Sequence, residues 1–413
     1  MNTKTTFSLL PVSAALAALA SAQDAVDPTA ELERVNRKLD VLYAELEDLR
    51  AGAEADAGDA SRLSIGGYGE YHANFAQDSS KFTDPHRFVV YLGYDFGDGI
   101  QLVSETEIEH GFVKDGDGEI SIEQLYADIT VNETFGVRLG RLLNPLGIIN
   151  QRHEPTTFSG VERPNLEKYL VPSTWSQDGI GLWGRASDEV TWELQLTTGL
   201  DGSGFSAKNG IRGGRMKERP GFSDPALSGR LDWRPSDTEG LRLGASFYSG
   251  GGDNGDQGSN PDVDSRVDIL ALDADYDLGS IELRGVLVKS HVSGADDLNA
   301  AFGNNVGEEQ LGWYLQADWH LFQAFEGLAP GEDAKYPDSD LVAFVRLEEY
   351  DTMDKVAAGG TDDPTADRQE TTFGLGYWLT PNFVIKADYQ ALDDATNDRA
   401  NQLNLGIGWT LLP

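Results

Sequence analysis

The sequence contains no cysteine, so hydrogen bonds and packing alone must stabilise the fold. No stretch after the N-terminal segment approaches the ~18 consecutive apolar residues that a transmembrane helix requires. Basic residues are scarce: 32 Lys and Arg stand against 69 Asp and Glu among 413 residues, which gives a formal net charge of −37. A surface this acidic repels nucleic acid, and we exclude nucleic acid as a partner.

Residues 1–22 predict a cleaved secretory signal peptide. Lys4 supplies the positive charge, a short apolar stretch follows, and Ala20-Ser21-Ala22 fits a small-x-small cleavage site. We therefore expect the chain to be exported and the mature protein to begin near Gln23.

Residues 23–51 predict a coiled-coil segment, because apolar residues recur at alternating intervals of three and four. The seam consists of Leu32, Val35, Leu39, Leu42, Leu46 and Leu49. About three heptads are only marginally stable alone, so we expect partner chains. The alternative is an amphipathic helix packed against its own domain. Residues 52–62 are rich in Ala, Gly and Asp and predict a linker.

From residue 63 to residue 413 the apolar period changes to two, which is typical of β-strands. We predict sixteen strands of about ten residues, the length that a tilted strand needs to cross a bilayer. Tight connections such as Gly97-Asp98-Gly99 alternate with long polar loops, of which 144–177 is the longest. The connection 322–338 is long where a tight turn is expected. The pattern favours an all-β fold: a 16-stranded antiparallel transmembrane β-barrel after a short coiled-coil helix.

Alternation alone does not distinguish a membrane barrel from a soluble β-protein. Seven of the eight tryptophans fall in predicted strands, several near strand ends, where interfacial girdles lie. A barrel in lipid would direct its apolar residues outward and its charged residues into a water-filled lumen. The candidate lumen-wall residues are Arg87, Glu105, Glu107, Glu109, Arg138, Arg230, Arg234, Arg346 and Glu348. In a soluble protein the same residues would form an ordinary solvated face.

The connection 144–177 contains prolines, aromatics and apolar residues, so we expect it to be ordered inside the barrel. The run from Gly140 to Ile148, with His153-Glu154-Pro155, Phe158 to Pro164 and Val171 to Trp175, resembles the phosphate-selective porin O and P family. The resemblance implies a sixteen-stranded trimeric outer-membrane porin whose third loop narrows the pore. Some trimeric porins carry an N-terminal coiled coil, which agrees with residues 31–50.

In that family, basic residues of the third loop and the facing wall guide anions. The resemblance therefore implies pore or constriction roles for Arg141, Arg152, His153, Glu154, Arg163 and Lys168. The chain departs from the pattern in its acidity and in its C-terminal Leu412-Pro413, where outer-membrane barrels commonly end in an aromatic residue. The acidity fits a solvated surface, or cation bridging to lipopolysaccharide, or a cation bias in the pore.

These features together predict passive diffusion of small hydrophilic solutes and ions, with a preference for anions such as phosphate or carboxylates. The expected partners are outer-membrane lipid and lipopolysaccharide, and the expected assembly is a homotrimer. The alternative is a structural or adhesion barrel with acidic extracellular loops and little conductance. The six histidines show no metal-ligand spacing and no G-x-S-x-G motif occurs, so we expect no enzyme activity, no cofactor and no metal.

Overall fold

The computed structural model describes residues 62–77, 81–111, 118–215, 219–252, 263–325, 327–331 and 333–411. The predicted signal peptide 1–22, the coiled-coil segment 23–51 with its seam from Leu32 to Leu49, and the linker up to residue 61 lie outside these ranges. Among the described residues, no helix is long and apolar enough to cross a membrane.

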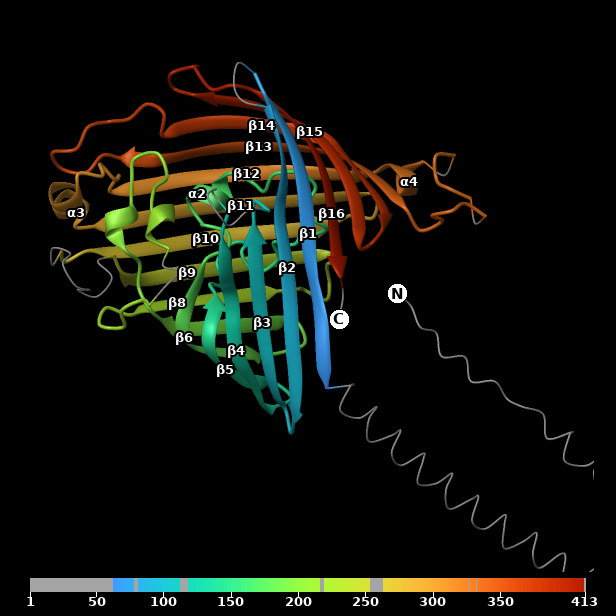
Figure 1. Cartoon of the computed structure of the whole chain (residues 1–413), viewed down its shortest axis with the longest axis horizontal. Coiled ribbons are helices and arrows are strands. Elements are labelled where there is room, and N and C mark those ends of the chain that lie inside the picture. Colours follow the sequence, from blue (N-terminus) through green and yellow to red (C-terminus); the bar gives the residue numbers. More distant parts are fainter. Residues whose placement is uncertain are drawn as a thin grey trace, which may run out of the picture. The chain divides into compact units, whose positions relative to one another are not determined.

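Sixteen antiparallel strands of the described chain close into one barrel, in which each strand pairs with its neighbours in sequence and β1 pairs with β16 (Figure 1). The strands are β1 (Leu63–Ala76), β2 (Lys81–Gly97), β3 (Ile100–Glu109), β4 (Ile120–Asn132), β5 (Phe135–Leu143), β6 (Ser176–Arg185), β7 (Val190–Thr197), β8 (Ala226–Trp233), β9 (Leu241–Gly251), β10 (Arg266–Asp277), β11 (Ile281–Ser293), β12 (Glu309–His320), β13 (Asp340–Lys355), β14 (Asp367–Thr380), β15 (Phe383–Asp394) and β16 (Gln402–Leu411). The predicted number of strands and their antiparallel closure are confirmed.

Short turns gather at one end of the barrel, which we call the turn side, and longer connections gather at the other, the loop side. Asp98 of the β2–β3 turn has φ +52°, and flanking glycines tolerate the same left-handed region. The connection between β12 and β13 is the exception that the sequence indicated, because it contains α4 (Leu321–Ala324) and continues to residue 339. The loop side carries α2 (Leu166–Tyr169), α3 (Ala295–Phe302), η2 (Gly202–Gly204) and η3 (Arg212–Gly214).

The outer face of the barrel is apolar. In β16, Leu403 and Leu405 are each 44% exposed, whereas Asn404 between them is 0% exposed. The same inversion recurs around the wall, as the period of two predicts. Aromatic residues lie exposed near the turn-side strand ends: Phe96, Trp233, Trp319 and Phe383. They match the interfacial position that such side chains favour.

Two tryptophans near the turn-side strand ends point inward instead. The Trp183 indole Nε1 donates to Asp128 Oδ1 at 2.8 Å, and the Trp378 indole Nε1 donates to the Thr156 carbonyl at 3.3 Å. A tryptophan near a strand end therefore does not by itself indicate an outward-facing girdle, because the same residue type also caps loops from inside.

The barrel interior is not uniformly polar, although the sequence predicts polar and charged residues along a water-filled lumen. On β10, Val267 and Ile269 point inward and are buried, while Leu270 points outward and is exposed. These inward residues join a hydrophobic cluster with Leu166 and Trp175, which come from the connection between β5 and β6. Burying each large apolar side chain contributes roughly 1.5–3 kcal/mol, so this part of the lumen is a packed core that holds the connection in place.

Candidate functional site

The connection between β5 and β6 comprises residues 144–175 and ends two residues before the predicted end at residue 177, because β6 begins at Ser176. These residues fold into the lumen, and we call them the inner loop. Side chains from several strands of the barrel wall form hydrogen bonds with this loop. Asp388 of β15 accepts from the Val161 amide at 2.5 Å, and Lys386 Nζ donates to the Gly160 carbonyl at 2.8 Å. Ser159 donates to Asp318 of β12. Because the backbone polar groups are satisfied by the wall, the loop can cross the barrel without regular secondary structure.

Glu167 of α2 connects several parts of the inner loop by hydrogen bonds. Its carboxylate accepts from the amides of Ile148 and Ile149 at 2.8 and 2.7 Å and from the Tyr314 hydroxyl at 2.8 Å. Burial raises the pKa of Glu167 to about 7 against the lowering effect of these hydrogen bonds. The carboxylate thus ties the start of the loop to its helix and to β12.

His153 and Glu154 attach the loop to the opposite wall. His153 Nε2 lies 3.2 Å from Glu123 Oε2 and 3.4 Å from Glu105 Oε1. Burial opposes the charged imidazolium, but these two carboxylates outweigh burial and hold the pKa of His153 well above its usual value. The Tyr91 hydroxyl donates to Glu154 Oε1 at 3.1 Å. Both residues, predicted at the constriction, therefore anchor the loop to β2, β3 and β4.

Cavities lie on both sides of the inner loop. The loop-side cavity, about 290 Å³, is lined by Arg163, Lys168 and Arg212 among others. On the turn side, two cavities of about 290 and 270 Å³ lie against the loop. Phe158 lines both the loop-side cavity and the larger of these turn-side cavities. Its ring is buried beneath Lys386 Nζ, 4.0 Å from the ring centroid. Phe158 therefore stands between two spaces of the lumen.

Two arginines of the loop-side cavity, Arg163 and Arg212, hydrogen-bond to neutral oxygens. Arg163 Nη1 donates to Ser173 Oγ at 3.3 Å, and Arg212 Nη1 donates to the Lys168 carbonyl at 2.9 Å. Burial and, to a smaller extent, the neighbouring Arg215 together lower the pKa of Arg212 to about 9. Arg212 and Arg215 come from the connection between β7 and β8, which folds onto the inner loop.

Arginines of the turn-side wall are matched by carboxylates. Arg230 lies 2.8 Å from Asp273, and Arg242 lies 2.6 Å from the same carboxylate oxygen. Arg284 lies 2.8 Å from Asp275, and Arg138, farther round the wall, lies 2.9 Å from Asp128. Positive and negative side chains thus alternate around this part of the lumen.

The other predicted lumen-wall residues differ in their access to water. Arg87, Glu105, Glu107, Arg346 and Glu348 point inward but are at most 3% exposed, because the inner loop and its neighbours cover them. They fasten side chains and loop backbone: Glu348, for example, accepts from the Leu166 amide at 3.0 Å. The inward direction predicted for these five is correct, but direct contact with water is not.

The remaining predicted residues lie nearer to solvent. Glu109 lines the loop-side cavity. Arg234 directly follows β8 and is exposed on the turn side. Arg152 is exposed in the inner loop. Partial desolvation of its guanidinium by the surrounding lumen, and then the nearby Arg242, lower its pKa.

Arg141 is placed differently from the prediction, because it lies on the outer face. It pairs with Asp178 at 2.6 Å, and Leu139, two residues earlier on β5, is 43% exposed outward. Strand alternation puts residues 139 and 141 on the same face, opposite to Arg138. The parity of the strand was thus a signal in the sequence that excludes Arg141 from the lumen.

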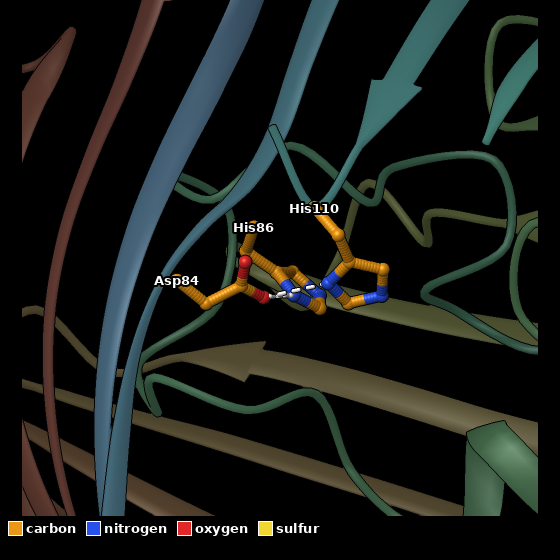
Figure 2. Close-up of side chains that lie close together, drawn as sticks. All are labelled: Asp84, His86 and His110. Atoms are coloured by element: carbon orange, nitrogen blue, oxygen red, sulfur yellow. Dashed lines mark hydrogen bonds and ion pairs between the residues drawn. The ribbon is translucent and has the colours of Figure 1, made fainter. Parts of the chain in front are cut away.

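Sequence reasoning missed three residues that come together near the loop-side cavity. Asp84, His86 and His110 lie around one carboxylate oxygen (Figure 2). The sequence shows no metal-ligand spacing here, because His110 is brought to the other two by the pairing of β2 with β3. Phe158 was also missed as a cavity-lining residue, since only the folding of the inner loop across the lumen places it there. Arg212 belongs to a basic cluster in the connection between β7 and β8, and this connection reaches the same cavity.

The fold matches known channels of the outer membrane. An anion-selective porin from Comamonas acidovorans aligns with a TM-score of 0.55 at 12% identity, covering 84% of this chain and 99% of that chain. OmpF of Salmonella typhi, in complex with daunomycin, gives 0.53 at 12% identity over 84% and 97%, and the channel DcaP of Acinetobacter baumannii gives 0.52 at 10% over 84% and 96%. The chain has the sixteen-stranded barrel fold of these porins.

Sequence comparison places the chain in a narrower group. No family model matches it. It is 32% identical over 343 residues to an uncharacterized protein of Aquifex aeolicus strain VF5, covering 79% of this chain and 75% of that protein. The chain belongs to the same family as that protein.

Proposed function

We propose that the protein is an outer-membrane channel for the passive diffusion of small hydrophilic solutes and ions, exported by the signal peptide 1–22. The observation that carries this proposal is the inversion of the barrel: apolar side chains outside, charged side chains inside, and cavities on both sides of an inner loop. An apolar exterior with water-accessible cavities inside suits a barrel surrounded by lipid.

A preference for anions such as phosphate or carboxylates is part of the proposal. Arg163, Lys168 and Arg212 line one cavity, and the hydrogen bonds described for the two arginines go to neutral oxygens. Guanidinium groups bind phosphate and carboxylate in a fork geometry. The fold shared with an anion-selective porin and the resemblance to the phosphate-selective porin O and P family support the same preference. Glu70 and Glu162 line the cavity too and would moderate it.

Reversal potentials test this function directly. Purified protein is inserted into planar bilayers in a KCl gradient, and we expect a reversal potential of the sign for anion preference. Replacing both Arg163 and Arg212 by alanine should move that potential towards or past zero, because two positive charges leave the solute path. Lys289→Ala is the matched control, since Lys289 is an exposed cation paired with Glu309 at 2.6 Å. Folded wild-type protein that never conducts would exclude a channel.

We also propose that three chains assemble in the membrane, with residues 23–51 forming a three-stranded coiled coil and lipopolysaccharide bound outside. The heptad seam supports this assembly, as does the trimeric form of a structure of similar fold, OmpT of Vibrio cholerae (TM-score 0.51, 12% identity). Conductance in the recordings above should then appear in groups of three equal steps.

A structural or adhesion barrel is the second candidate, and the dense fastening of the inner loop favours it. Glu348 and Arg346 are buried beneath the loop, and the hydrophobic cluster fills part of the lumen. This candidate predicts negligible conductance in the wild type and in Phe158→Ala alike, whereas a channel predicts conductance in both.

A further inference from the structure

We propose that Asp84, His86 and His110 form a binding site for a divalent transition-metal ion of the zinc, nickel or copper type. The three side chains converge on one point (Figure 2). Asp84 Oδ2 lies 3.1 Å from His86 Nδ1 and 2.7 Å from His110 Nδ1, and the three ligand atoms lie within 4.8 Å of one another. Tetrahedral zinc with bonds of 2.0–2.2 Å separates its ligand atoms by about 3.3 Å, so small side-chain movements suffice.

The fold brings His86 to this point through an irregularity in β2. Glu70 of β1 is opposite Arg87, but His72 is opposite Asp84, so two residues of β2 face a single residue of β1. Strict alternation would put His86 on the same outer face as Phe88; the bulge turns it inward instead. There its ring stacks on that of His72, with centroids 4.4 Å apart.

His110 is held in place at a conformational cost. Its φ of +57° lies in the left-handed region, which residues other than glycine rarely adopt. Its amide donates to the His86 carbonyl at 3.0 Å, which fixes the two histidines opposite each other. Strained backbone of this kind persists where the surroundings determine it and is concentrated at functional sites.

The surroundings suit a metal that enters from the lumen. The side chains of His86 and His110 are 30% and 39% exposed, and both residues line the loop-side cavity. Glu109 and Glu162 line the same space, so negative charge and room for water ligands are at hand. The positive side chains of this cavity would repel a cation that is held by charge alone, as calcium or magnesium is. Two imidazoles and one carboxylate instead favour transition metals, because imidazole nitrogen is a ligand that these metals prefer.

This inference deepens the proposed function, and it rests on that function only for the route by which the ion arrives. A metal held at the edge of the loop-side cavity would place positive charge beside the solute path. The channel would then bind a transition-metal ion, or an anion that coordinates such an ion, beside the solute path.

Calorimetric titration with Zn²⁺ tests the site. The full-length protein is purified in detergent without a histidine tag, dialysed against chelator and titrated with ZnCl₂. We expect one saturable site per chain in the wild type, and at least ~10-fold weaker binding in His86→Ala and His110→Ala. His320→Ala is the matched control, because His320 also contacts a lumen carboxylate, Asp340, but no second histidine joins that pair in the described chain. Circular dichroism verifies that each variant retains its β-structure.

The outcomes separate the two proposals. Zn²⁺ binding that depends on His86 and His110 supports the site even if the protein does not conduct, in which case only the channel fails. A conducting wild type that binds no Zn²⁺ overturns the site and leaves the channel intact. Equal affinity in His86→Ala and the wild type also overturns the assignment, because the ion would then be bound elsewhere.

Discussion

On the turn side of the inner loop, Arg230, Arg242 and Arg284 each lie within 3 Å of an aspartate. On the loop side, Arg163 and Arg212 donate to a hydroxyl and a backbone carbonyl instead. A cation matched by an adjacent carboxylate contributes little field beyond the pair, whereas one bonded to neutral oxygens acts over about a Debye length, ~8 Å at physiological salt.

The comparison shows that arginine has different roles on the turn side and on the loop side of the lumen. Turn-side arginines stabilise the wall and hold the loop: Arg230 Nη1 also donates to the Gly147 carbonyl at 2.6 Å. Arg163 and Arg212 of the loop side carry charge into a cavity, whereas Arg87, which lines the same cavity, is paired with Glu70. The formal net charge of the chain is therefore a poor guide to the local charge, since −37 overall coexists with a loop-side cluster of positive residues.

Breaking a turn-side pair should have the largest effect on stability. Asp273, whose side chain is 0% exposed, pairs with both Arg230 and Arg242. Arg230→Ala removes one of these two ion pairs. Removing one partner of a buried ion pair costs about 3–5 kcal/mol, and the remaining Arg242 should hold the loss near ~3 kcal/mol. Urea unfolding in liposomes measures it. Adding Asp273→Asn should recover part of the loss; no recovery would show that Arg230 acts mainly through the Gly147 carbonyl.

Glu167 should make the fastening of the inner loop depend on pH. Its folded pKa of about 7 exceeds the ordinary value of 4.5, so the folded state keeps a proton that the unfolded chain releases. Stability should therefore fall as pH rises from about 4.5 through 7, by ~2–3 kcal/mol, and Glu167→Gln should lack this loss. Melting temperatures of both proteins at pH 5 and pH 8 provide the measurement.

Groups such as His153 titrate in both of these proteins, so the difference between their pH profiles isolates Glu167. Parallel profiles for the wild type and Glu167→Gln would mean that the carboxyl does not hold an extra proton in the fold.

Removing the Phe158 ring between the loop-side and turn-side cavities should have a smaller effect, which is seen in conductance. Phe158 lines both the loop-side cavity and a turn-side cavity. Phe158→Ala should therefore widen the passage and increase single-channel conductance by about twofold or more. Phe373→Ala is the control, since Phe373 is 51% exposed on the outer face and its loss should leave conductance unchanged. An unchanged conductance in Phe158→Ala would place the narrowest point elsewhere.

Much of the fold could be predicted because a period of two is local information. The sixteen strands, the outward apolar face and the inward course of residues 144–175 followed from spacing, length and composition. Arg138 and Arg230 point into the lumen for the same reason. The parity of β5 also excluded Arg141 from the lumen, although the family resemblance suggested otherwise.

The site could be predicted only in part, because its geometry depends on contacts between distant segments. A bulge in β2 reverses the direction of His86, and strand pairing then adds His110 to the group. Similarly, Arg212 reaches the loop-side cavity because the connection between β7 and β8 folds onto the inner loop. Neither arrangement has a signature in the spacing of residues.

Alternation along the extended segments, by itself, determined that this chain forms a wall with an apolar face and an opposite face that carries most of the charged residues. The tertiary structure alone decided which charges meet water and which are covered. The reason is physical: the side-chain direction in a strand is set by neighbouring residues, whereas burial depends on what the rest of the chain places against that face. Arg346, charged and inward as the pattern indicates, is 0% exposed because the inner loop lies over it.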